Sequence, residues 1–555
     1  MLKYPKVVAI MCITLSIIAC ADKNGVESPV LSFEDYAHYF SQFNEKDDEL
    51  YKQYVTNEEV IPFLKKNIPL LDIPDSIIQK TYYFRWWTFR KHIKQTSNGF
   101  VITEFLPEVP WSGKYNTINC PAAYHIYEGR WLRDNIYIKD YINYWLNEAD
   151  NVRKYSFWVS NATLAFGKVH KDTAFLKKQF PKLIDNYNTW EKERRDGPNR
   201  LFWQNDNMDG MELSSGGRII NNGEENFSSL AARPTINSYM YADAKAIAEL
   251  ATFFDDLSLT LRYQAKARQI KELVENRLWN DSLNFFTILP RDYTEHDKPI
   301  AIRELIGYTP WYFNLPDDDL KYSKAWEKVL DTTAFAAPYG LTTVEQAHPY
   351  FQIKYEGHEC QWNGPSWPFA TTQTLKSLSN FLNNYKYKDN LSKNDYFQLL
   401  KQNAAAHQIA RYNGDTQMWI DENINPFTGD WISRTRLKNW DNGTWSAEKG
   451  GVERGKDYNH SGFCDLVIND LIGFKPQLDG SIIIKPLIPD NWDWFCLDRI
   501  NYQGKDLTII WDRNGTRYNR GKGFQIVYDG KQLYRSTEIE NTTLKIRSNI
   551  HNNDL

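Results

Sequence analysis

The chain has 555 residues, with 66 Lys and Arg against 70 Asp and Glu, a hydrophobic fraction of 42% and a charged fraction of 25%. These fractions are those of globular proteins, so a wholly disordered or fibrous chain is excluded, and the formal net charge of −4 leaves no basic surface for nucleic acid. The 20 Trp, 34 Tyr and 29 Phe give an aromatic content of 15%, which permits a protein that binds sugar rings but does not establish one.

Residues 1–19 are predicted to be an export signal. A short positively charged stretch precedes an apolar run, Val7 to Ala19, which is too short to span a bilayer of about 30 Å. The run ends in Ile17-Ile18-Ala19-Cys20, which resembles a bacterial lipobox with cleavage before Cys20. That resemblance implies a lipid on Cys20 and a cell-envelope lipoprotein, facing the periplasm or on the outer-membrane surface. An ordinary secretory signal with a chance cysteine is the alternative.

The body of the chain is predicted to be helical. After a tether at 20–30, apolar positions recur at helical spacing from Phe33 to His92, and Trp86 and Trp87 are expected in the core. The clearest helix further on is 237–256, because it is rich in Ala. The other predicted amphipathic segments are 134–148, 172–192, 258–278, 366–384 and 396–412.

After Gly473 the pattern changes to short strands. Ser481–Lys485, Leu507–Trp511 and Phe524–Tyr528 are apolar runs with turn residues between them. We therefore expect a helical domain over 31–475 and a small β domain over 476–555. A helical domain of this length has many apolar faces to bury, and a closed ring of helical hairpins would bury them and leave a cavity at its centre. The tryptophans of the β domain, Trp492, Trp494 and Trp511, are expected to be core residues.

The cysteines of the body do not form a recognisable cluster. Cys120, Cys360, Cys464 and Cys496 make no CxxC pair and no zinc-ligand spacing, so we expect buried thiols and no zinc site. No other metal and no cofactor is expected. An exported protein is permitted a disulfide, but sequence alone cannot pair these residues.

Three polar and aromatic segments carry the candidate chemistry. Glu422 lies between a helix-like run and a Pro/Gly turn, the kind of loop that carries function. The segment 356–368 offers two indoles, amides and carboxylates before a predicted helix, and 203–212 holds three carboxylates, those of Asp206, Asp209 and Glu212. Two carboxylates on opposite sides of a cavity can cleave a glycosidic bond, one as acid and one as base.

These segments resemble a known group of glycosidases. Gln361–Pro368 resembles the Gln-Trp-Asp-x-Pro-x-Gly-Trp-x-Pro motif of trehalases and its counterpart in glycoside hydrolase family 63, which includes processing α-glucosidases and mannosylglycerate hydrolases. Further segments resemble the same families in the same order: Asn207–Asp209, Arg233–Ser238, Phe335–Thr343 and Glu422–Gly429.

The resemblance implies a mainly α fold, an (α/α)6 barrel or six-hairpin toroid, with a small C-terminal β-sandwich-like domain. It also implies a metal-free inverting mechanism with Asp209 as acid and Glu422 as base. The residues after Asp209 depart from the family pattern, which leaves Asp206 and Glu212 open as alternative acids. Asn363 replaces the trehalase Asp, so trehalase itself is disfavoured.

The resemblance and the local sequence also suggest residues that line the site. Trp131 is expected to stack on a sugar ring and Asp134 to accept from its hydroxyls, with an Arg–Asp salt bridge at a helix start as the alternative. His358 and His460 are expected as lining or as structural histidines. The full predicted substrate-binding set is Arg130, Trp131, Asp134, Arg233, Asn237, His358, Gln361, Trp362, Trp367, Tyr458 and His460.

The leading hypothesis is a monomeric, exo-acting, inverting glycoside hydrolase that trims oligosaccharides at the bacterial envelope. A second hypothesis is elimination or dehydration of a uronic acid, which needs a base and a cation for the carboxylate. The residues available for that chemistry are Arg130, Arg133, Arg233, Tyr458 and His460. A third hypothesis is a catalytically inactive glycan-binding lipoprotein. The presence of both Asp209 and Glu422 argues against it, because a binding protein does not need both carboxylates.

Overall fold

The computed structural model describes residues 29–225, 228–294, 296–355, 358–388, 391–410, 415–433 and 453–546. The predicted signal, most of the tether and Cys20 lie outside these ranges, so the lipid anchor stays a prediction. Within the described ranges, no helix combines the length and apolar character needed to cross a membrane.

Six helical segments form a closed inner ring. Each packs against the next, and the last packs against the first. The inner helices are buried over most of their surface because an outer layer covers them. In ring order they are α4 (Ala122–Gly129), α6 (Val159–His170), α9 (Pro234–Phe253), α11 (Thr309–Tyr312), α13 (Pro368–Asn384) and α16 (Phe463–Asp465), which continues into the π-helix η8 (Leu466–Leu471).

An outer layer of longer, amphipathic helices packs on this ring. Its members are α3 (Ser76–Lys91), α5 (Ile136–Asn147), α7 (Thr173–Arg194), α10 (Leu257–Arg277) and α14 (Lys393–Ala406). All six predicted amphipathic segments are confirmed as helices of the two layers. The smaller helices are α1 (Ala37–Asn44), α2 (Val60–Asn67), α8 (Ser215–Ile220) and α12 (Leu320–Ser323).

Helix α14 ends earlier than predicted, and the helix-like run expected before Glu422 is a strand. Gln408–Ala410 (β11) and Thr416–Met418 (β12) pair antiparallel as a two-stranded ribbon, so the chain reaches Glu422 in extended form. Other short strands brace the ring loops: β2 (Ile93–Thr96) with β3 (Gly99–Ile102), β4 (Trp203–Asn205) with β5 (Leu230–Ala232) and β8 (Leu289–Pro290), β6 (Trp279–Asn280) with β7 (Phe285–Phe286), and β9 (Ala336–Ala337) with β10 (Gly340–Leu341).

The C-terminal part of the chain forms two antiparallel sheets, and the three predicted strands are confirmed there. One sheet has the order β13-β14-β19 and the other β1-β15-β16-β17-β18. Strand β1 (Leu70–Asp72) comes from the N-terminal part of the chain and pairs with β15, with Leu71 opposite Leu497. The C-terminal strands are β13 (Phe474–Pro476), β14 (Ile482–Ile484), β15 (Trp494–Tyr502), β16 (Lys505–Asp512), β17 (Gly523–Tyr528), β18 (Lys531–Ser536) and β19 (Thr542–Leu544).

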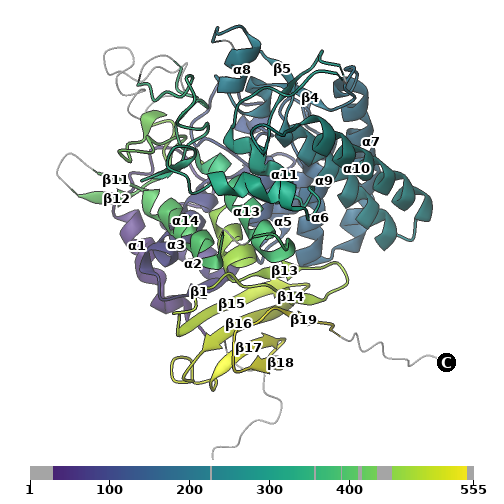
Figure 1. Ribbon diagram of the computed structural model, residues 1–555. Helices are drawn as coiled ribbons and strands as arrows, with labels where there is room; N and C mark the ends of the chain where they lie inside the picture. The colour runs from purple at the N-terminus through teal and green to yellow at the C-terminus, as the bar shows by residue number, and fades with distance from the viewer. Residues whose placement is uncertain are drawn as a thin grey trace, which may run out of the picture.

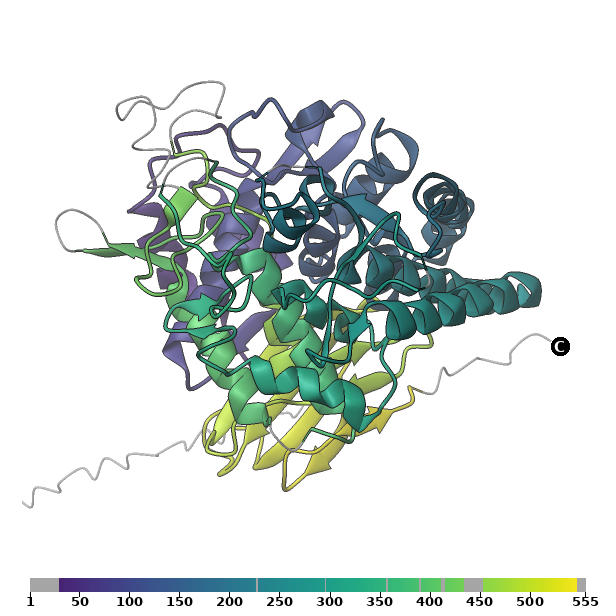
Figure 2. The same ribbon diagram turned by 45° about the horizontal axis from the view of Figure 1, so that its top comes forward.

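These sheets cover the end of the ring where the inner helices finish. Trp131, directly after α4, packs on Phe474 at 5.8 Å between ring centroids, and the Gln503 amide donates to the carbonyl of Val169 in the last turn of α6. Figures 1 and 2 show the yellow strands below the helices, with α8, β4 and β5 at the opposite end. The loops that lead into the inner helices gather at that opposite end.

Candidate active site

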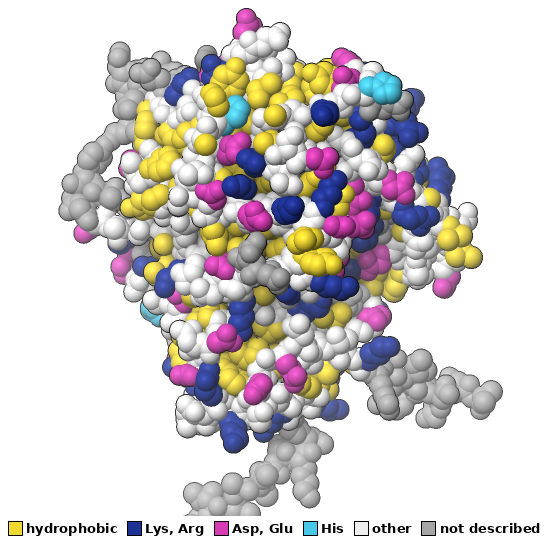
Figure 3. All heavy atoms as spheres, in the orientation of Figure 1, with side chains coloured by type: hydrophobic (Ala, Val, Ile, Leu, Met, Phe, Trp, Pro, Cys, Tyr) yellow, Lys and Arg dark blue, Asp and Glu magenta, His cyan; other side chains and the backbone are white. Residues whose placement is uncertain are grey.

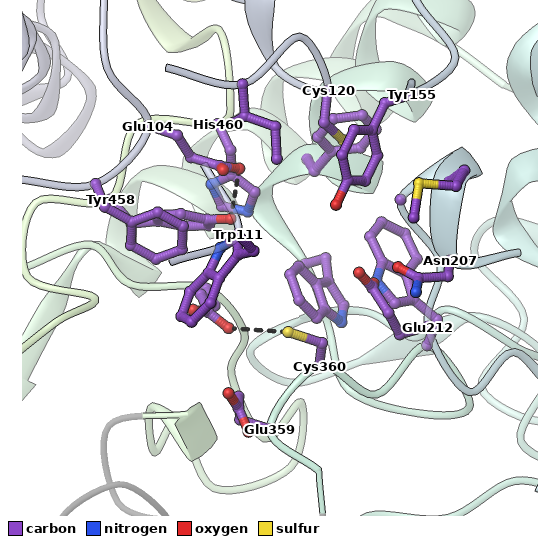
Figure 4. A pocket seen from close by; sticks show the side chains of 18 of the residues that line it. Glu104, Trp111, Cys120, Tyr155, Asn207, Glu212, Glu359, Cys360, Tyr458 and His460 are labelled. Carbon is purple, nitrogen blue, oxygen red and sulfur yellow. Dashed lines mark hydrogen bonds between the residues drawn. The ribbon is translucent and has the colours of Figure 1, made fainter. Parts of the chain in front are cut away.

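A cavity of about 400 Å³ lies where the inner helices begin. Part of its lining comes from residues just before four of these helices: Cys120 precedes α4, Tyr155 precedes α6, Trp367 is the N-cap residue of α13, and His460 precedes α16. Helix N-termini carry partial positive charge, so this end of the ring favours carboxylates. Figure 4 shows the side chains that surround the cavity.

Glu212 projects into the cavity from a sharply turned segment. After β4 the chain makes a 3-10 turn at Asn207–Asp209, and Gly210 (φ 75°) and Leu213 (φ 58°) both adopt left-handed conformations. A side chain at Gly210 would place its Cβ 2.8 Å from the Cys120 sulfur, so glycine allows the close approach. Strained backbone beside a cavity carboxylate is a common feature of functional sites.

Asp209 does not line the cavity, which corrects its predicted position. Its carboxylate is buried, accepts a hydrogen bond from the Thr235 hydroxyl and lies near Arg233. Asp206 is also buried and accepts from the Ser229 amide at 3.2 Å. Of the three carboxylates that the sequence left open, Glu212 is the one that reaches the cavity.

Glu422 reaches the cavity from a loop that is tied to the segment before α13. The backbones of Ser366 and Ile424 exchange two hydrogen bonds of 3.0 and 2.9 Å, which holds the loop in place. Arg454 donates to one oxygen of Glu422, and the Cys360 thiol donates to the other at 3.4 Å. Both oxygens of this carboxylate are therefore oriented by donors.

Arg454 is shared between two carboxylates. It also donates to Glu359 at 2.8 Å, and it is almost wholly buried. The following residue is Gly455, where a Cβ would lie 1.8 Å from a carboxylate oxygen of Asp421. A side chain there would force the two segments apart, so the glycine lets Arg454 approach Glu422.

Burial controls the ionisation of these groups. It raises the pKa of Glu212 to about 8, with added repulsion from Glu422, and it raises the pKa of Glu422 to about 7 although Arg454 opposes the shift. A third cavity carboxyl, Glu104, also has its pKa raised by burial to about 8. Burial opposes ionisation of Glu359 too, but Arg454 outweighs it and lowers the pKa of that carboxyl to about 2. The cavity thus holds carboxyls of both kinds, neutral and ionised.

Aromatic side chains form the walls. Trp362 and Trp367 stack at 4.6 Å with an interplanar angle of 17°, and Tyr458 packs on His460 at 3.9 Å. Both pairs line the cavity, as His358 does, so five of the predicted substrate-binding residues lie where the sequence placed them.

The Arg130 group lies at the other end of the ring, which corrects its predicted role. Helix α4 ends at Gly129, so the residues after it face the C-terminal sheets. Arg130 and Trp131 both donate to Asp465, at 2.7 and 2.8 Å, and Asp134 pairs with Lys66 at the surface. The alternative of a structural role is the one that the geometry supports.

Three further predicted residues are buried but do not line the cavity. Arg233 donates to the carbonyl of Ser229 at 3.4 Å and lies close to Asp206 and Asp209. The amide of Asn237 bonds to the backbone of Phe202, and the carbonyl of Gln361 accepts from the indole of Trp367 at 2.7 Å. These residues hold the loops that carry the cavity side chains.

Sequence analysis missed several cavity residues. Glu104 and Arg454 belong to no segment that suggested chemistry, because each reaches the cavity only through contacts distant in the chain. A local signal did exist for Glu212, because it belongs to the segment 203–212, whose three carboxylates the sequence singles out. The other missed lining residues are Phe105, Trp111, Ile118, Cys120, Lys154, Tyr155, Met208, Gly210 and Phe369.

The four cysteines of the described body are free thiols. Cys464 and Cys496 are buried, as expected, whereas Cys120 and Cys360 are partly exposed and line the cavity. Over the described ranges, no group of three or more His, Cys, Asp and Glu side chains is placed to hold a metal ion.

Comparison with known proteins identifies the family. The model of the mannosylglycerate hydrolase MGH1-like glycoside hydrolase domain matches residues 114–461, and that of the glycosyl hydrolase family 65 C-terminal domain matches residues 476–534. A solved structure named sialidase is 40% identical over 91% of this chain, with a TM-score of 0.81, but this chain spans only 44% of that protein.

More distant structures include the GH63 mannosylglycerate hydrolase from Thermus thermophilus, which is 12% identical with a TM-score of 0.47 over 70% of this chain and 99% of that one. The neutral trehalase Nth1 from Saccharomyces cerevisiae is 14% identical with a TM-score of 0.43 over 60% of this chain and 73% of that one. The match of the family model covers more than half of the sequence. The chain therefore belongs to the mannosylglycerate hydrolase MGH1-like glycoside hydrolase family.

Proposed function

We propose that the protein is an exo-acting, inverting glycoside hydrolase in which Glu212 is the general acid and Glu422 the general base. The observation that carries this proposal is the presence of Glu212 and Glu422 in one aromatic-walled cavity, with their surroundings acting differently on the two groups. The family membership supports the reaction class, and the roles of the residues rest on their geometry.

Glu212 suits the acid because burial favours the neutral form of its carboxyl. Its raised pKa keeps the proton on at neutral pH, and among the described residues no side chain donates a hydrogen bond to it. The proton is therefore available for the glycosidic oxygen as the bond to the leaving group breaks.

Glu422 suits the base because two donors orient its carboxylate. Arg454 lowers its pKa against the effect of burial, so an ionised form is accessible near neutral pH. An ionised Glu422 can take a proton from a water molecule that attacks the anomeric carbon from the side opposite the leaving group. That displacement inverts the configuration of the sugar.

The shape of the ring supports exo action. The C-terminal sheets cover the far end of the ring, and the cavity volume of about 400 Å³ is in the range of pockets that hold one small ligand. A chain end fits such a cavity better than the middle of a polysaccharide.

The arginines expected to bind the substrate carboxylate in a uronic-acid elimination do not line the cavity. Arg130, Arg133 and Arg233 lie away from the cavity, and the Arg454 guanidinium is already bonded to Glu359 and Glu422. Tyr458 and His460 do line the cavity, so a base is present, but the partner for a substrate carboxylate is not among the predicted residues.

The test is a panel of plant, fungal and algal oligosaccharides, followed by NMR of the first product anomer. The proposal expects release of a single sugar unit from a chain end with inverted configuration. Retention of configuration, or an unsaturated product that absorbs in the ultraviolet, would contradict it. The lipid on Cys20 is part of the same proposal, and mass spectrometry of the protein purified from envelope membranes tests it.

A further inference from the structure

The cavity contains more carboxyl groups than hydrolysis uses. Glu104 and Glu359 accompany Glu212 and Glu422, and the buried cation that faces them is Arg454. Lys154 also lines the cavity, but it is exposed at the rim, where it donates to a backbone carbonyl at 3.3 Å. Basic and acidic side chains are interspersed over the face drawn in Figure 3, whereas the described cavity lining gathers four carboxyl groups around one buried guanidinium.

Glu104 is held in a fixed position by the segment that leads into α16. The Tyr458 hydroxyl donates to its Oε1 at 2.6 Å, and the Asn459 amide donates to its backbone carbonyl at 3.0 Å. The Tyr458 ring is itself packed between Phe105, at 4.6 Å, and His460, at 3.9 Å. A carboxyl fixed in this way adds no cost of side-chain ordering when a ligand binds.

Only one oxygen of the Glu104 carboxyl is occupied. Across the described ranges, no hydrogen bond reaches Oε2, and the residue lines the cavity. Figure 4 places Glu104 on a different side of the cavity from Glu212, beside Tyr458 and Trp111. A sugar held between these sides would present a hydroxyl to Glu104 while its glycosidic oxygen faces Glu212.

The charge balance opposes an acidic sugar in the same place. The Arg454 guanidinium is bonded to two carboxylates, so it cannot neutralise a third without giving up one of them. A sugar carboxylate or sulfate would be buried beside the carboxylates of Glu359 and Glu422, which already share the Arg454 guanidinium, so its charge would find no buried cation of its own among the described lining residues.

We propose that Glu104 is a specificity-determining residue that binds a hydroxyl group of an uncharged sugar at the point of cleavage. This inference rests on the proposed function, because it names the class of sugar that the same cavity accepts. Glu104 lies before residue 114, where the family match begins, so family membership does not assign it a role.

The first experiment measures binding apart from turnover. The inactive variant Glu422→Gln is titrated calorimetrically with matched pairs: glucose and glucuronic acid, galactose and galacturonic acid, and also rhamnose, mannose and sialic acid. We expect at least one neutral sugar to bind and its acidic counterpart to bind about tenfold more weakly or worse. Equal or tighter binding of a uronic or sialic acid, or no binding of any neutral sugar, would overturn the inference. If neutral sugars bind but the wild-type protein hydrolyses no substrate, the proposed hydrolysis is contradicted while the proposed sugar specificity stands.

The second experiment tests Glu104 itself. Glu104→Ala and Glu104→Gln are titrated with the preferred sugar and with its deoxy derivatives, one hydroxyl removed at a time. We expect Glu104→Ala to weaken binding about tenfold or more, because a buried hydrogen bond is lost. One deoxy sugar should bind the wild-type cavity more weakly by the same factor, because it lacks the hydroxyl that Glu104 binds. The same deoxy sugar should bind Glu104→Ala as well as the parent sugar does. Losses that add for every deoxy sugar would show that Glu104 does not touch the ligand.

Two control variants distinguish a direct loss of binding from a loss caused by misfolding. Glu108→Gln changes a nearby carboxylate whose side chain is 88% exposed, and it is expected to leave binding unchanged. Tyr458→Phe keeps the ring but removes the donor to Glu104, so it is expected to weaken binding of the same hydroxyl without unfolding the protein. Undiminished selectivity for that hydroxyl in both Glu104→Ala and Tyr458→Phe would refute the assignment.

Discussion

The backbone carbonyl of Glu212 accepts a hydrogen bond of 3.1 Å from the backbone amide of Trp362. This bond joins the segment that carries the proposed acid to the stacked pair Trp362–Trp367, although the two residues are far apart in the sequence. The acid and the aromatic wall are therefore positioned together, and a change in either segment moves the other.

Glu212→Gln is expected to lower kcat by about 10²- to 10⁴-fold on substrates with a poor leaving group, because the proton donor is lost. The loss should be much smaller on a dinitrophenyl glycoside, whose leaving group departs without a proton. Steady-state kinetics on both substrate types checks this. Equal losses on the two would show that Glu212 does not protonate the leaving group.

Asp209→Asn is the matched variant from the same turn. It weakens the acceptor of the Thr235 hydroxyl and removes a charge near Arg233, so it should destabilise the fold by about 1–3 kcal/mol. Its kcat, measured well below the unfolding temperature, should stay within about tenfold of the wild-type value, far above that of Glu212→Gln. A loss as large as that of Glu212→Gln would return the acid role to Asp209.

The pH profile of kcat/KM should be bell-shaped. Glu422 must be ionised, so the rate falls as the pH drops through about 7, and Glu212 must be protonated, so the rate falls as the pH rises through about 8. Because the two carboxyls interact, the apparent values belong to the pair. A flat profile between pH 5 and 9 would contradict the assignment.

Arg454 should set the acidic side of that profile. It lowers the pKa of Glu422, so Arg454→Met is expected to move the acidic limb to higher pH while the basic limb changes less. The same change leaves two buried carboxylates without their partner, at a cost of about 3–5 kcal/mol, which calorimetric unfolding measures. Arg513→Met, in an exposed ion pair, is the control and should shift neither limb.

Gly210→Ala tests the close approach behind the acid. The residue has a φ of 75°, and the added Cβ would lie 2.8 Å from the Cys120 sulfur. Gly504→Ala has a similar φ of 83° but open space around the new Cβ, so it carries only the backbone cost of a left-handed residue, about 1–2 kcal/mol. We expect Gly210→Ala to be the less stable of the two and to lose activity. Equal stability would show that the contact with Cys120 is easily relieved.

Much of the fold follows from local sequence. Helix α9 continues through an Ala-rich run, so its presence and length are predictable, although it runs from Pro234 to Phe253, three residues earlier than the predicted 237–256. The C-terminal strands are short apolar runs between turn residues, and they form where the pattern places them.

The cavity lining is harder to predict, because residues that are close together in the sequence can lie at opposite ends of the ring. The resemblance places Trp131 beside the sugar, but α4 (Ala122–Gly129) precedes it, and these eight helical residues, about 12 Å of helix, carry Trp131 to the far end of the ring. Asp209 and Glu212 are three residues apart across a turn that contains the left-handed Gly210, and of the two only Glu212 lines the cavity. Glu104 meets Tyr458 across 354 positions of chain, a contact that no local pattern contains.

The pairing of β1 with β15 joins a segment that is synthesised early to one that is synthesised late. Asp72 lies opposite Cys496, and its carboxylate accepts from Arg517 and Tyr518, at 3.0 and 2.9 Å. During synthesis, Leu70–Asp72 must therefore wait as an unpaired edge until the last strands have left the ribosome. A translation product that stops before residue 494 keeps the whole ring of helices but exposes that edge, and its failure would be aggregation rather than a loss of chemistry.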